Sequence, residues 1–438
     1  MNILIISTQN PLKTSGIVGL NLYHGFKKEG HNIKLLIREY ADYQSPDIIS
    51  MESALDGKIK FWTDKFKFWN NKLVSKFNRA SFFNNRVITN PNYYVQDYDQ
   101  TKEIYSTKKI INKIPFKPDA IIYLFQHNFL TAKNLFELNQ ITGSKIFWYL
   151  MDTAPLTGGC HYSWDCEGYK KACGNCPAFN STVPKDQSYI NLSYKLKYIS
   201  KTGISIITPT EWQHKKSVES ILFKSKPTTK ILLSIDENVY NFISKATGRV
   251  KLGIPANKKV IFFGATSINH RRKGMRYLLE ALDVIKQQGI LNNEDILLLI
   301  AGDLDTNKFQ LPFESRQLGI LDNNEKLAAV YNAATVFVCP SIEDSGPMMV
   351  NQAIMTGTPV VSFNIGVSQD IVISGQTGYC ARLMDKEDLA NGIANVLLLN
   401  DVDYEIMCSN CRKIAMNNYS LKISTDKLIG FMQHESSN

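Results

Sequence analysis

The chain has 438 residues, of which 44% are hydrophobic, and it carries a formal net charge of +10. This composition excludes a disordered chain, and the length predicts two domains of roughly 200 residues each. No run of about 18 apolar residues occurs, and the apolar run Ile3–Ile6 is too short for a signal peptide. We therefore expect a cytoplasmic protein. The positive charge favours anionic partners: phosphorylated substrates, an anionic membrane surface or nucleic acid.

In the first half of the chain, apolar runs alternate with amphipathic segments. The apolar runs predict strands at 2–8, 119–125, 145–151 and 204–210. A helix, a tight turn at Gly30 and a further strand are expected within 16–37, and another helix at 130–141. Strands that are apolar throughout and alternate with helices predict a parallel sheet that is covered on both faces.

A second series of the same kind follows later in the chain. Strands are expected at 258–266, 295–303, 335–341 and 358–363, and helices at 274–289, 323–334, 348–357, 385–399 and 419–433. The fold class is therefore α/β with two Rossmann-like, doubly wound domains that face each other across a ligand cleft. The expected divisions are an N-terminal domain at 1–210, a linker at 211–250, a C-terminal domain at 251–412 and a helix at 413–438 packing back on the N-terminal domain.

One segment, 58–86, is rich in both basic and aromatic residues. It contains eight Lys or Arg and a single acid, Asp64. Phe66, Trp69, Leu73 and Phe77 follow helical spacing, with most of the basic residues off that face. A basic amphipathic helix with aromatic residues is typical of an anchor on an anionic membrane surface. The alternative is an ordinary helix whose aromatic side chains pack on the domain.

Two acids stand between a strand and a helix in PSIEDSGPMMVNQAIMTGTPVVSF, residues 340–363. Glu343 and Asp344 follow the carboxyl end of the expected strand, and a helix is expected to begin at Gly346–Pro347. Free amide groups at that helix end suit an anion or a sugar hydroxyl, and carboxylates accept hydrogen bonds from hydroxyls. The alternative is that the acids only cap the helix.

Basic residues stand at the mouth of an earlier helix, in FFGATSINHRRKGMRYLLEAL, residues 262–282. Arg272 and Lys273 precede this helix, where positive charge opposes the helix dipole. Such cations favour a bound anion such as a diphosphate, which Arg grips in a fork and Lys as a point charge. The alternative is a solvated basic turn.

Taken together, these stretches resemble the C-terminal half of the GT4 family of retaining glycosyltransferases, which have the GT-B fold. The motifs RKG (272–274), AGD (301–303), NAATVFVCPS (332–341), GTPVV (357–361) and GQTGYCA (375–381) stand in the family order. The resemblance is strong over 255–400 and weaker in the N-terminal half. One departure is Gln352, which stands where the family has its second motif glutamate. In the family that glutamate accepts hydrogen bonds from the ribose hydroxyls of the nucleotide, so the resemblance implies that a neutral Gln weakens ribose binding by roughly 1–2 kcal/mol.

The resemblance implies sugar transfer with retention from a UDP- or GDP-sugar to a saccharide or lipid-linked saccharide, with no metal required for the chemistry. The implied catalytic residues are Arg272, Lys273, Asp344 and, on the acceptor side, His127. The implied donor-binding residues are Gly16, Gly264, Ile320, Glu343, Gly346, Pro347, Met348, Met349 and Gln352. Gly16 is included because a glycine lets the backbone approach a ligand closely.

Four cysteines gather in one loop, MDTAPLTGGCHYSWDCEGYKKACGNCP, residues 151–177. Cys160, Cys166, Cys173 and Cys176 have the spacing Cys-x5-Cys-x6-Cys-x2-Cys. Four thiolates in a cytoplasmic loop suit tetrahedral Zn²⁺, and the alternatives are disulfides or free thiols. Similar loops occur in a subgroup of these transferases that builds surface polysaccharides. Because the loop follows the end of an expected strand, we expect it to border the cleft on the acceptor side.

Other classes of function remain open at this point. Gln352 leaves room for a sugar-nucleotide or polysaccharide-binding protein without activity, and the same two-domain fold also suits a sugar-nucleotide epimerase. The charge and the cysteine loop raise a zinc-containing nucleic-acid binder, but no RNA-module motif accompanies the basic segment. We therefore expect a nucleotide sugar, not a nucleic acid, as partner, and a location in the cytoplasm, on or near the inner face of the membrane.

Overall fold

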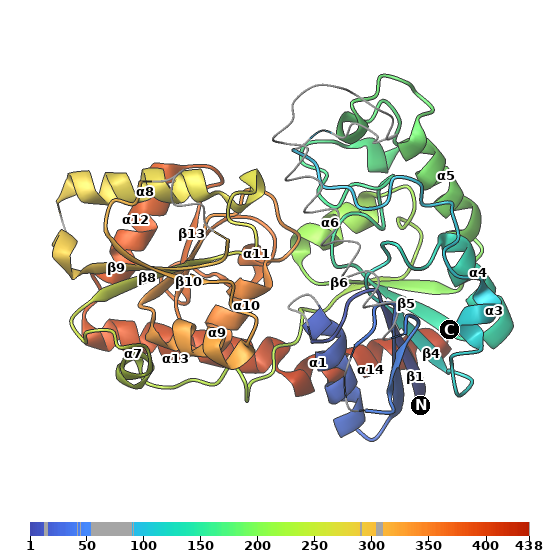
Figure 1. Cartoon of the computed structure of the whole chain (residues 1–438), viewed down its shortest axis with the longest axis horizontal. Helices are drawn as coiled ribbons and strands as arrows, with labels where there is room; N and C mark the ends of the chain where they lie inside the picture. Colours follow the sequence, from blue (N-terminus) through green and yellow to red (C-terminus); the bar gives the residue numbers. More distant parts are fainter. Residues whose placement is uncertain are drawn as a thin grey trace. The chain divides into compact units, whose positions relative to one another are not determined.

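A computed structural model describes residues 1–12, 16–41, 43, 45–53, 90, 92–289, 291–303 and 310–437 (Figure 1). The chain forms two compact units. The first comprises Met1–Ile206 and Glu219–Pro227, and the second Ile207–Val218 and Thr228–Asn438. The basic aromatic segment 58–86 lies outside the described residues. Within the described part of the chain, no helix has the length and apolar character to cross a membrane.

The first sheet has seven strands in the order β3-β2-β1-β4-β5-β6-β7. They are β1 (Asn2–Ser7), β2 (Asn32–Ile37), β3 (Ile48–Ser50), β4 (Ala120–Tyr123), β5 (Lys145–Tyr149), β6 (Ile204–Thr208) and β7 (Thr228–Lys230). β1 pairs in parallel with both β2 and β4. Ile3 to Ile6 of β1 are fully buried, which explains why these four successive positions are all apolar.

Helices connect these strands. They are α1 (Ile17–Lys28), α3 (Thr107–Ile111), α4 (Ala132–Thr142), α5 (Gln187–Ile199) and α6 (Glu211–Glu219). α4 shows why its sequence folds locally. Thr131 and Asn134 form a capping box at its start, and Gly143 ends it with a φ of 70°, in the left-handed region. α4 thereby begins directly after the loop that follows β4.

The second sheet has six parallel strands in the order β10-β9-β8-β11-β12-β13. They are β8 (Lys259–Gly264), β9 (Ile296–Ala301), β10 (Glu314–Gly319), β11 (Val336–Cys339), β12 (Val360–Phe363) and β13 (Gly378–Ala381). The chain runs outward from β8 to β10, returns to β11 beside β8, and then runs outward on the other side. The order therefore reverses between β8 and β11, where doubly wound sheets bind their ligands.

Helices cover both faces of the second sheet. The helices of the second unit after β7 are α7 (Lys245–Leu252), α8 (Met275–Gln288), α9 (Asn324–Ala333), α10 (Met348–Met355), α11 (Ser368–Ile371), α12 (Lys386–Leu397), α13 (Asp401–Tyr419) and the final helix, α14 (Leu421–Ser437), which follows α13. Figure 1 shows α8 and α12 over one face and α7, α9 and α13 over the other. In α8 the buried residues Leu278, Ala281, Leu282 and Ile285 form one apolar stripe against the sheet.

The predicted fold class is confirmed, because the chain forms two α/β units, each built on a parallel sheet. The expected helix at 348–357 is α10, and the expected final helix at 419–433 lies within α13 and α14, in the second unit. The divisions expected at 210, 250 and 412 stay predictions.

Candidate active site

Two loops meet at the point where the strand order of the second sheet reverses. One follows β8 and passes through a short 3₁₀ turn, Arg271–Lys273, into α8. The other follows β11 and leads into α10. The loops are joined through the backbone, because the Ile342 N–H donates to the Arg272 carbonyl oxygen at 2.8 Å. Two stretches far apart in the sequence therefore build one site at the carboxyl ends of neighbouring strands.

The structure brings Arg272, Lys273 and Asp344 into direct contact. Arg272 Nη1 and Lys273 Nζ each lie 2.7 Å from the same carboxylate oxygen, Asp344 Oδ2. The other oxygen, Oδ1, accepts from the Gly346 N–H at 3.2 Å. In the sequence-based picture the cations hold a diphosphate. In this structure the anion between them is the chain's own carboxylate, which also bonds to the backbone just before α10.

The charge state of this cluster follows from its burial and its partners. Asp344 is 5% exposed, whereas the Arg272 and Lys273 side chains are each 18% exposed. Burial opposes ionisation of the carboxyl group, but the charges of Lys273 and Arg272 outweigh it and hold the pKa of Asp344 below its usual value. The cluster therefore carries a net charge of +1 at neutral pH and faces solvent through its cations.

Gly274 fixes the distance between the two loops. Its φ is 70°, in the left-handed region that favours glycine, and it both ends the 3₁₀ turn and caps α8. A Cβ on Gly274 would collide with the Pro340 carbonyl oxygen of the other loop. The glycine of the RKG motif is thus required for the close approach of the loops that carry the cations and the carboxylate.

The other predicted donor residues of the second unit lie around this cluster or farther along the sheet. Pro347 caps α10, Met348 begins it, and Gly346 stands just before it. Gly264 ends β8 and lies against the Met349 side chain: a Cβ on Gly264 would lie only 2.6 Å from Met349 Cε. Glu343 is buried, with 5% of its surface exposed. Ile320 is 60% exposed and follows β10, two strands away from β8.

Gln352 is buried in a hydrogen-bonded chain of polar side chains. Its Oε1 accepts from the Tyr331 hydroxyl at 3.3 Å, and its Nε2 donates to the Tyr240 hydroxyl at 2.8 Å. The Tyr240 hydroxyl can in turn donate to Asn324 Oδ1 at 3.0 Å. With 2% of its surface exposed, Gln352 acts as donor and acceptor within the protein. This arrangement explains an amide where the family has an acid, and the predicted ribose contact stays a prediction.

Two predicted residues belong to the first unit. Gly16 precedes α1, and a Cβ there would collide with the Asn10 carbonyl oxygen, so the close approach that requires glycine is to the chain's own backbone. His127 lies in the loop after β4, with its Nε2 3.0 Å from Gln9 Nε2. Burial, followed by the charge of His161, lowers the pKa of His127 to about 4. His127 is therefore neutral at physiological pH.

Sequence reasoning missed the neighbours of His127. The His161 ring lies beside it with a centroid separation of 6.1 Å, and His161 Nδ1 lies 2.7 Å from Asp152 Oδ2. Burial opposes ionisation of Asp152, but His161 outweighs it and lowers the pKa of that carboxyl group. The signal was available, because Asp152 and His161 lie within the cysteine loop, but their spacing alone does not bring them together with His127.

The four cysteines of the loop line one small cavity of about 20 Å³. All four are free thiols, and burial raises the pKa of Cys173 to about 12 and that of Cys176 above its usual value. Within the residues that the structure describes, no three His, Cys, Asp or Glu side chains stand at the spacing of metal ligands. The four thiols thus line one cavity, and zinc binding would require them to move closer together.

Comparison with known proteins identifies the domain that holds the ion cluster. Residues 257–398 match the family model described as Glycosyl transferases group 1. The match includes both loops of the site, with Arg272, Lys273 and Asp344, and all strands of the second sheet. The model covers about a third of the chain and none of the first unit.

Curated relatives match over similar parts of the chain. A UDP-Gal:alpha-D-GlcNAc-diphosphoundecaprenol alpha-1,3-galactosyltransferase of Escherichia coli is 24% identical over 163 residues, which is 36% of this chain and 41% of that protein. A phosphatidyl-myo-inositol mannosyltransferase of Mycobacterium leprae is 32% identical over 152 residues, 33% of this chain and 38% of that protein. The matched part spans about two fifths of these relatives.

Solved structures match the whole chain. A sucrose-phosphate synthase from Thermosynechococcus elongatus aligns with a TM-score of 0.67 at 15% identity, over 100% of both chains. Anabaena Alr3699/HepE, solved in complex with UDP and glucose, aligns with a TM-score of 0.61 at 13% identity, over 99% of this chain and 100% of that one. The chain therefore has the two-domain GT-B fold and carries a Glycosyl transferases group 1 domain at residues 257–398.

Proposed function

We propose that this protein is a glycosyltransferase that transfers a sugar, with retention, from a UDP- or GDP-sugar to a saccharide or lipid-linked saccharide. The observation that carries the proposal is the cluster of Arg272, Lys273 and Asp344 at the strand-order reversal of the second sheet. The UDP in the HepE structure and the UDP-Gal in the name of the Escherichia coli relative support a nucleotide-sugar donor.

Donor binding follows from the charges of the site. The two cations stand at the start of α8, where an anion is favourable, and their side chains are partly exposed. A donor diphosphate gains bidentate contacts from Arg272 and a point charge from Lys273. Asp344 neutralises part of this charge in the free protein and lowers the cost of holding two cations together. Once the diphosphate has replaced Asp344 as the partner of Arg272 and Lys273, the Asp344 carboxylate accepts hydrogen bonds from sugar hydroxyls.

Chemistry at the anomeric carbon generates charge on the leaving diphosphate. Arg272 and Lys273 stabilise that charge most when it is greatest, in the transition state, so they raise the rate as well as the affinity. The first-turn amides of α10, at Met348 and Met349, have no partner within the helix and add donors beside the sugar. These side chains and amides supply the positive charge, and the proposal therefore includes no catalytic metal.

The acceptor side is assigned to the first unit. The neutral His127 imidazole accepts or donates one hydrogen bond at a hydroxyl, and with a pKa of about 4 it is a weak base. We assign it to positioning the acceptor hydroxyl. A saccharide or lipid-linked acceptor is supported by the diphosphoundecaprenol acceptor in the name of the Escherichia coli relative.

A lipid-linked acceptor would place the protein at a membrane surface. We propose that the basic aromatic segment 58–86 binds anionic lipid at the inner face of the membrane. Co-sedimentation with vesicles that contain phosphatidylglycerol, compared with vesicles of phosphatidylcholine alone, tests this. Equal binding to both, or none, rejects the membrane role of the segment and leaves the enzymatic proposal intact.

We also propose that Cys160, Cys166, Cys173 and Cys176 hold a structural zinc ion. Their thiols line one cavity, and four thiolates complete a tetrahedral coordination shell. Without zinc, the loop is held by hydrogen bonds such as the one that the Cys176 N–H donates to Asp186 Oδ2, at 2.8 Å. A bound zinc ion would link its segments more tightly. Metal analysis after purification without added zinc should find about one equivalent. Eight titratable thiols in denaturant with no bound zinc would remove this assignment.

One alternative is a sugar-nucleotide or polysaccharide-binding protein that has the same fold but no transferase activity. Gln352 stands in place of the second acid of the family motif, and its amide is hydrogen-bonded to Tyr331 and Tyr240. In this alternative the amide has a structural role, and the site binds a sugar nucleotide without turning it over. A sugar-nucleotide epimerase is a second alternative, which needs no acceptor.

Incubation with a panel of UDP- and GDP-sugars, with and without saccharide acceptors, separates these functions. Release of the nucleoside diphosphate together with a new glycosidic bond, of the same anomeric configuration as the donor by NMR, supports the transferase. Tight binding without any product favours the binding protein. An isomerised sugar nucleotide without acceptor favours the epimerase.

A further inference from the structure

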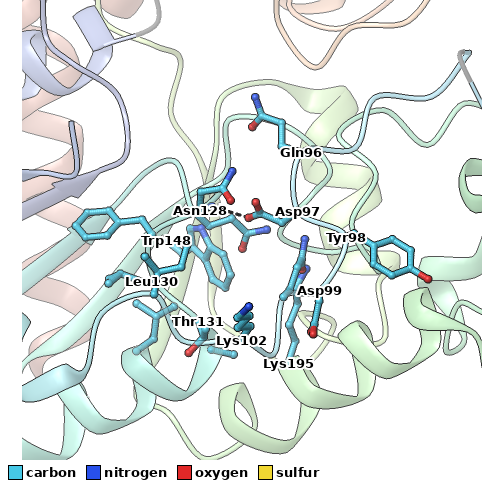
Figure 2. A pocket seen from close by; sticks show the side chains of 16 residues that line it. Gln96, Asp97, Tyr98, Asp99, Lys102, Asn128, Leu130, Thr131, Trp148 and Lys195 are labelled. Carbon is cyan, nitrogen blue, oxygen red and sulfur yellow. Dashed lines mark hydrogen bonds between the residues drawn. The ribbon is translucent and has the colours of Figure 1, made fainter. Parts of the chain in front are cut away.

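The first unit contains a cavity of about 320 Å³ that the proposed function does not use (Figure 2). Its wall comes from the segment Gln96–Ile104, the loop between β4 and α4, the first residues of α4, Trp148 of β5 and Lys195 of α5. The volume lies at the lower end of the range of small-molecule sites, about 300–1,000 Å³. None of its lining residues belongs to the predicted donor or acceptor set.

Four buried polar atoms of this wall have no hydrogen-bond partner among the residues that the structure describes. They are Asp97 Oδ1, Gln100 Oε1, Gln126 Nε2 and Trp148 Nε1. Leaving such an atom unpaired costs about 1–3 kcal/mol, so most buried polar atoms in proteins are paired. Four in one cavity indicate that a partner from outside the chain satisfies them.

Two of the side chains that carry these atoms, Asp97 and Trp148, are held in place by their neighbours. Asp97 Oδ2 accepts from the Asn128 N–H at 2.6 Å, and Asn128 adopts a left-handed backbone with a φ of 50° (Figure 2). Trp148 is 1% exposed and packs on Phe223. Burial raises the pKa of Asp97 above its usual value. The unpaired atoms of Asp97 and Trp148 are therefore preorganised.

Lys195 supplies a buried positive group beside these atoms. Its ammonium donates to the carbonyl oxygens of Ala154 and Thr157, at 2.6 Å and 2.8 Å, which leaves one of its three protons for another acceptor. Burial lowers the pKa of Lys195 to about 8. The cavity thus contains one buried cation, one buried carboxyl group and neutral amide and indole groups.

We propose that this cavity binds a neutral, polyhydroxylated ligand, namely a saccharide unit. The unpaired atoms comprise two acceptors, on Asp97 and Gln100, and two donors, on Gln126 and Trp148. A hydroxyl group both donates and accepts, so a saccharide can satisfy all four. A phosphate or carboxylate would satisfy only the donors and would meet the Asp97 carboxylate. Apolar neighbours such as Phe129 and Leu135 suit the C–H faces of a sugar ring.

The site would act independently of the donor site. All its lining residues fall within the first unit, whereas the ion cluster lies in the second. Saccharide binding is therefore expected without any nucleotide, and in a variant in which the donor site is disabled, such as Lys273→Ala. Failure of the proposed glycosyl transfer would leave this binding unaffected.

The test uses the full chain and simple probes. Binding of methyl α-glucoside, methyl α-mannoside, methyl β-galactoside and maltose is measured by saturation-transfer NMR and by the shift in Tm, with inorganic phosphate as the anionic probe. The variant is Gln100→Leu/Gln126→Leu, which removes one unpaired acceptor and one unpaired donor. The matched control is Gln140→Leu, an exposed residue of α4 outside the cavity.

We expect at least one saccharide to bind, the double variant to bind it about tenfold or more weakly, and Gln140→Leu to bind like wild type. Without ligand, the Tm of the double variant should equal or exceed that of wild type, because the unpaired amide atoms that it removes have no partner among the residues that the structure describes. The proposal is overturned if no probe saccharide binds at about 50 mM, which would leave a water-filled cavity. It is also overturned if only phosphate binds, or if the double variant binds normally or loses Tm.

Discussion

At the residue scale, the site depends on which anion lies between Arg272 and Lys273. In the free protein it is Asp344, whose Oδ2 lies 2.7 Å from both cations. The two charges and the carboxylate come from positions 72 and 71 residues apart, so neither motif reveals the contact alone. We propose that Asp344 has two successive roles, which are to neutralise the cations before the donor binds and to hold sugar hydroxyls afterwards.

The variant Asp344→Asn should separate these two roles, because it removes the charge of the side chain and keeps its size. Neutralising the carboxylate leaves two partly buried cations together, and we expect the free energy of unfolding to fall by about 2 kcal/mol. Because a diphosphate then replaces the lost charge, UDP or GDP should raise the Tm of this variant more than that of wild type, while transfer is lost. Differential scanning fluorimetry with and without nucleotide measures both. A variant that no longer responds to either nucleotide would contradict the neutralising role.

His127 gives a prediction about pH. Its pKa is about 4 in the folded protein and 6.5 in the unfolded chain, so the unfolded chain binds a proton first as the pH falls. Stability is therefore lost between about pH 6.5 and pH 4. Urea unfolding at about pH 7 and pH 5 should show that wild type loses about 2 kcal/mol more than His127→Gln over this interval.

The control for this measurement is His24→Gln, since His24 is exposed on α1. It should lose as much stability on acidification as wild type. If His127→Gln and wild type lose equal stability, the imidazole is not buried in its neutral form, and its assignment to acceptor positioning fails with it.

At the element scale, the position of the cations depends on how α8 begins. Gly274 and Gly289 cap the two ends of this helix, and both are left-handed, with φ values of 70° and 63°. Only Gly274 approaches other atoms: a Cβ there meets the Pro340 carbonyl oxygen, whereas a Cβ on Gly289 meets nothing within 4 Å. The same helix therefore offers a test and its own control.

Gly274→Ala and Gly289→Ala should both lose about 1 kcal/mol through the left-handed backbone. Gly274→Ala should lose more, because its Cβ also forces apart the loops that carry Lys273 and Asp344, and its affinity for UDP or GDP should fall at least about tenfold. Chemical unfolding and calorimetric titration measure the two effects. Equal losses in the two variants would show that the loop contact does not position the cations.

At the scale of the whole molecule, the sequence predicted the two α/β units because their buried strands contain unbroken apolar runs, as in Ile3–Ile6 of β1 and in all of β9. It also predicted the start of α10, because Gly346–Pro347 signals a helix end. The order of strands in each sheet could not be predicted from the hydrophobic periodicity of the sequence, since β8 and β11 become neighbours only through tertiary packing. The same holds for the partners of His127 and for the cavity around Asp97, whose residues carry no motif.

Gln352 shows a different limit. Its place in the motif suggested a weakened ribose contact, but its amide bridges Tyr331 and Tyr240, and those tyrosines lie 21 and 112 residues away in the chain. A substitution that looks like a loss of function in the motif is, in the folded protein, a matched donor and acceptor. Sequence alone could not distinguish the two interpretations, because both depend on which groups surround the side chain.

The most direct test of the whole account is the affinity for nucleoside diphosphate, measured by calorimetry with UDP and GDP. The variant is Lys273→Ala, and the control is Arg271→Ala, an exposed cation of the same turn. We predict that wild type binds at least one of the two nucleotides, that Lys273→Ala binds it about tenfold to a hundredfold more weakly, and that Arg271→Ala stays within about threefold of wild type. Equal affinity of wild type and Lys273→Ala would contradict the account.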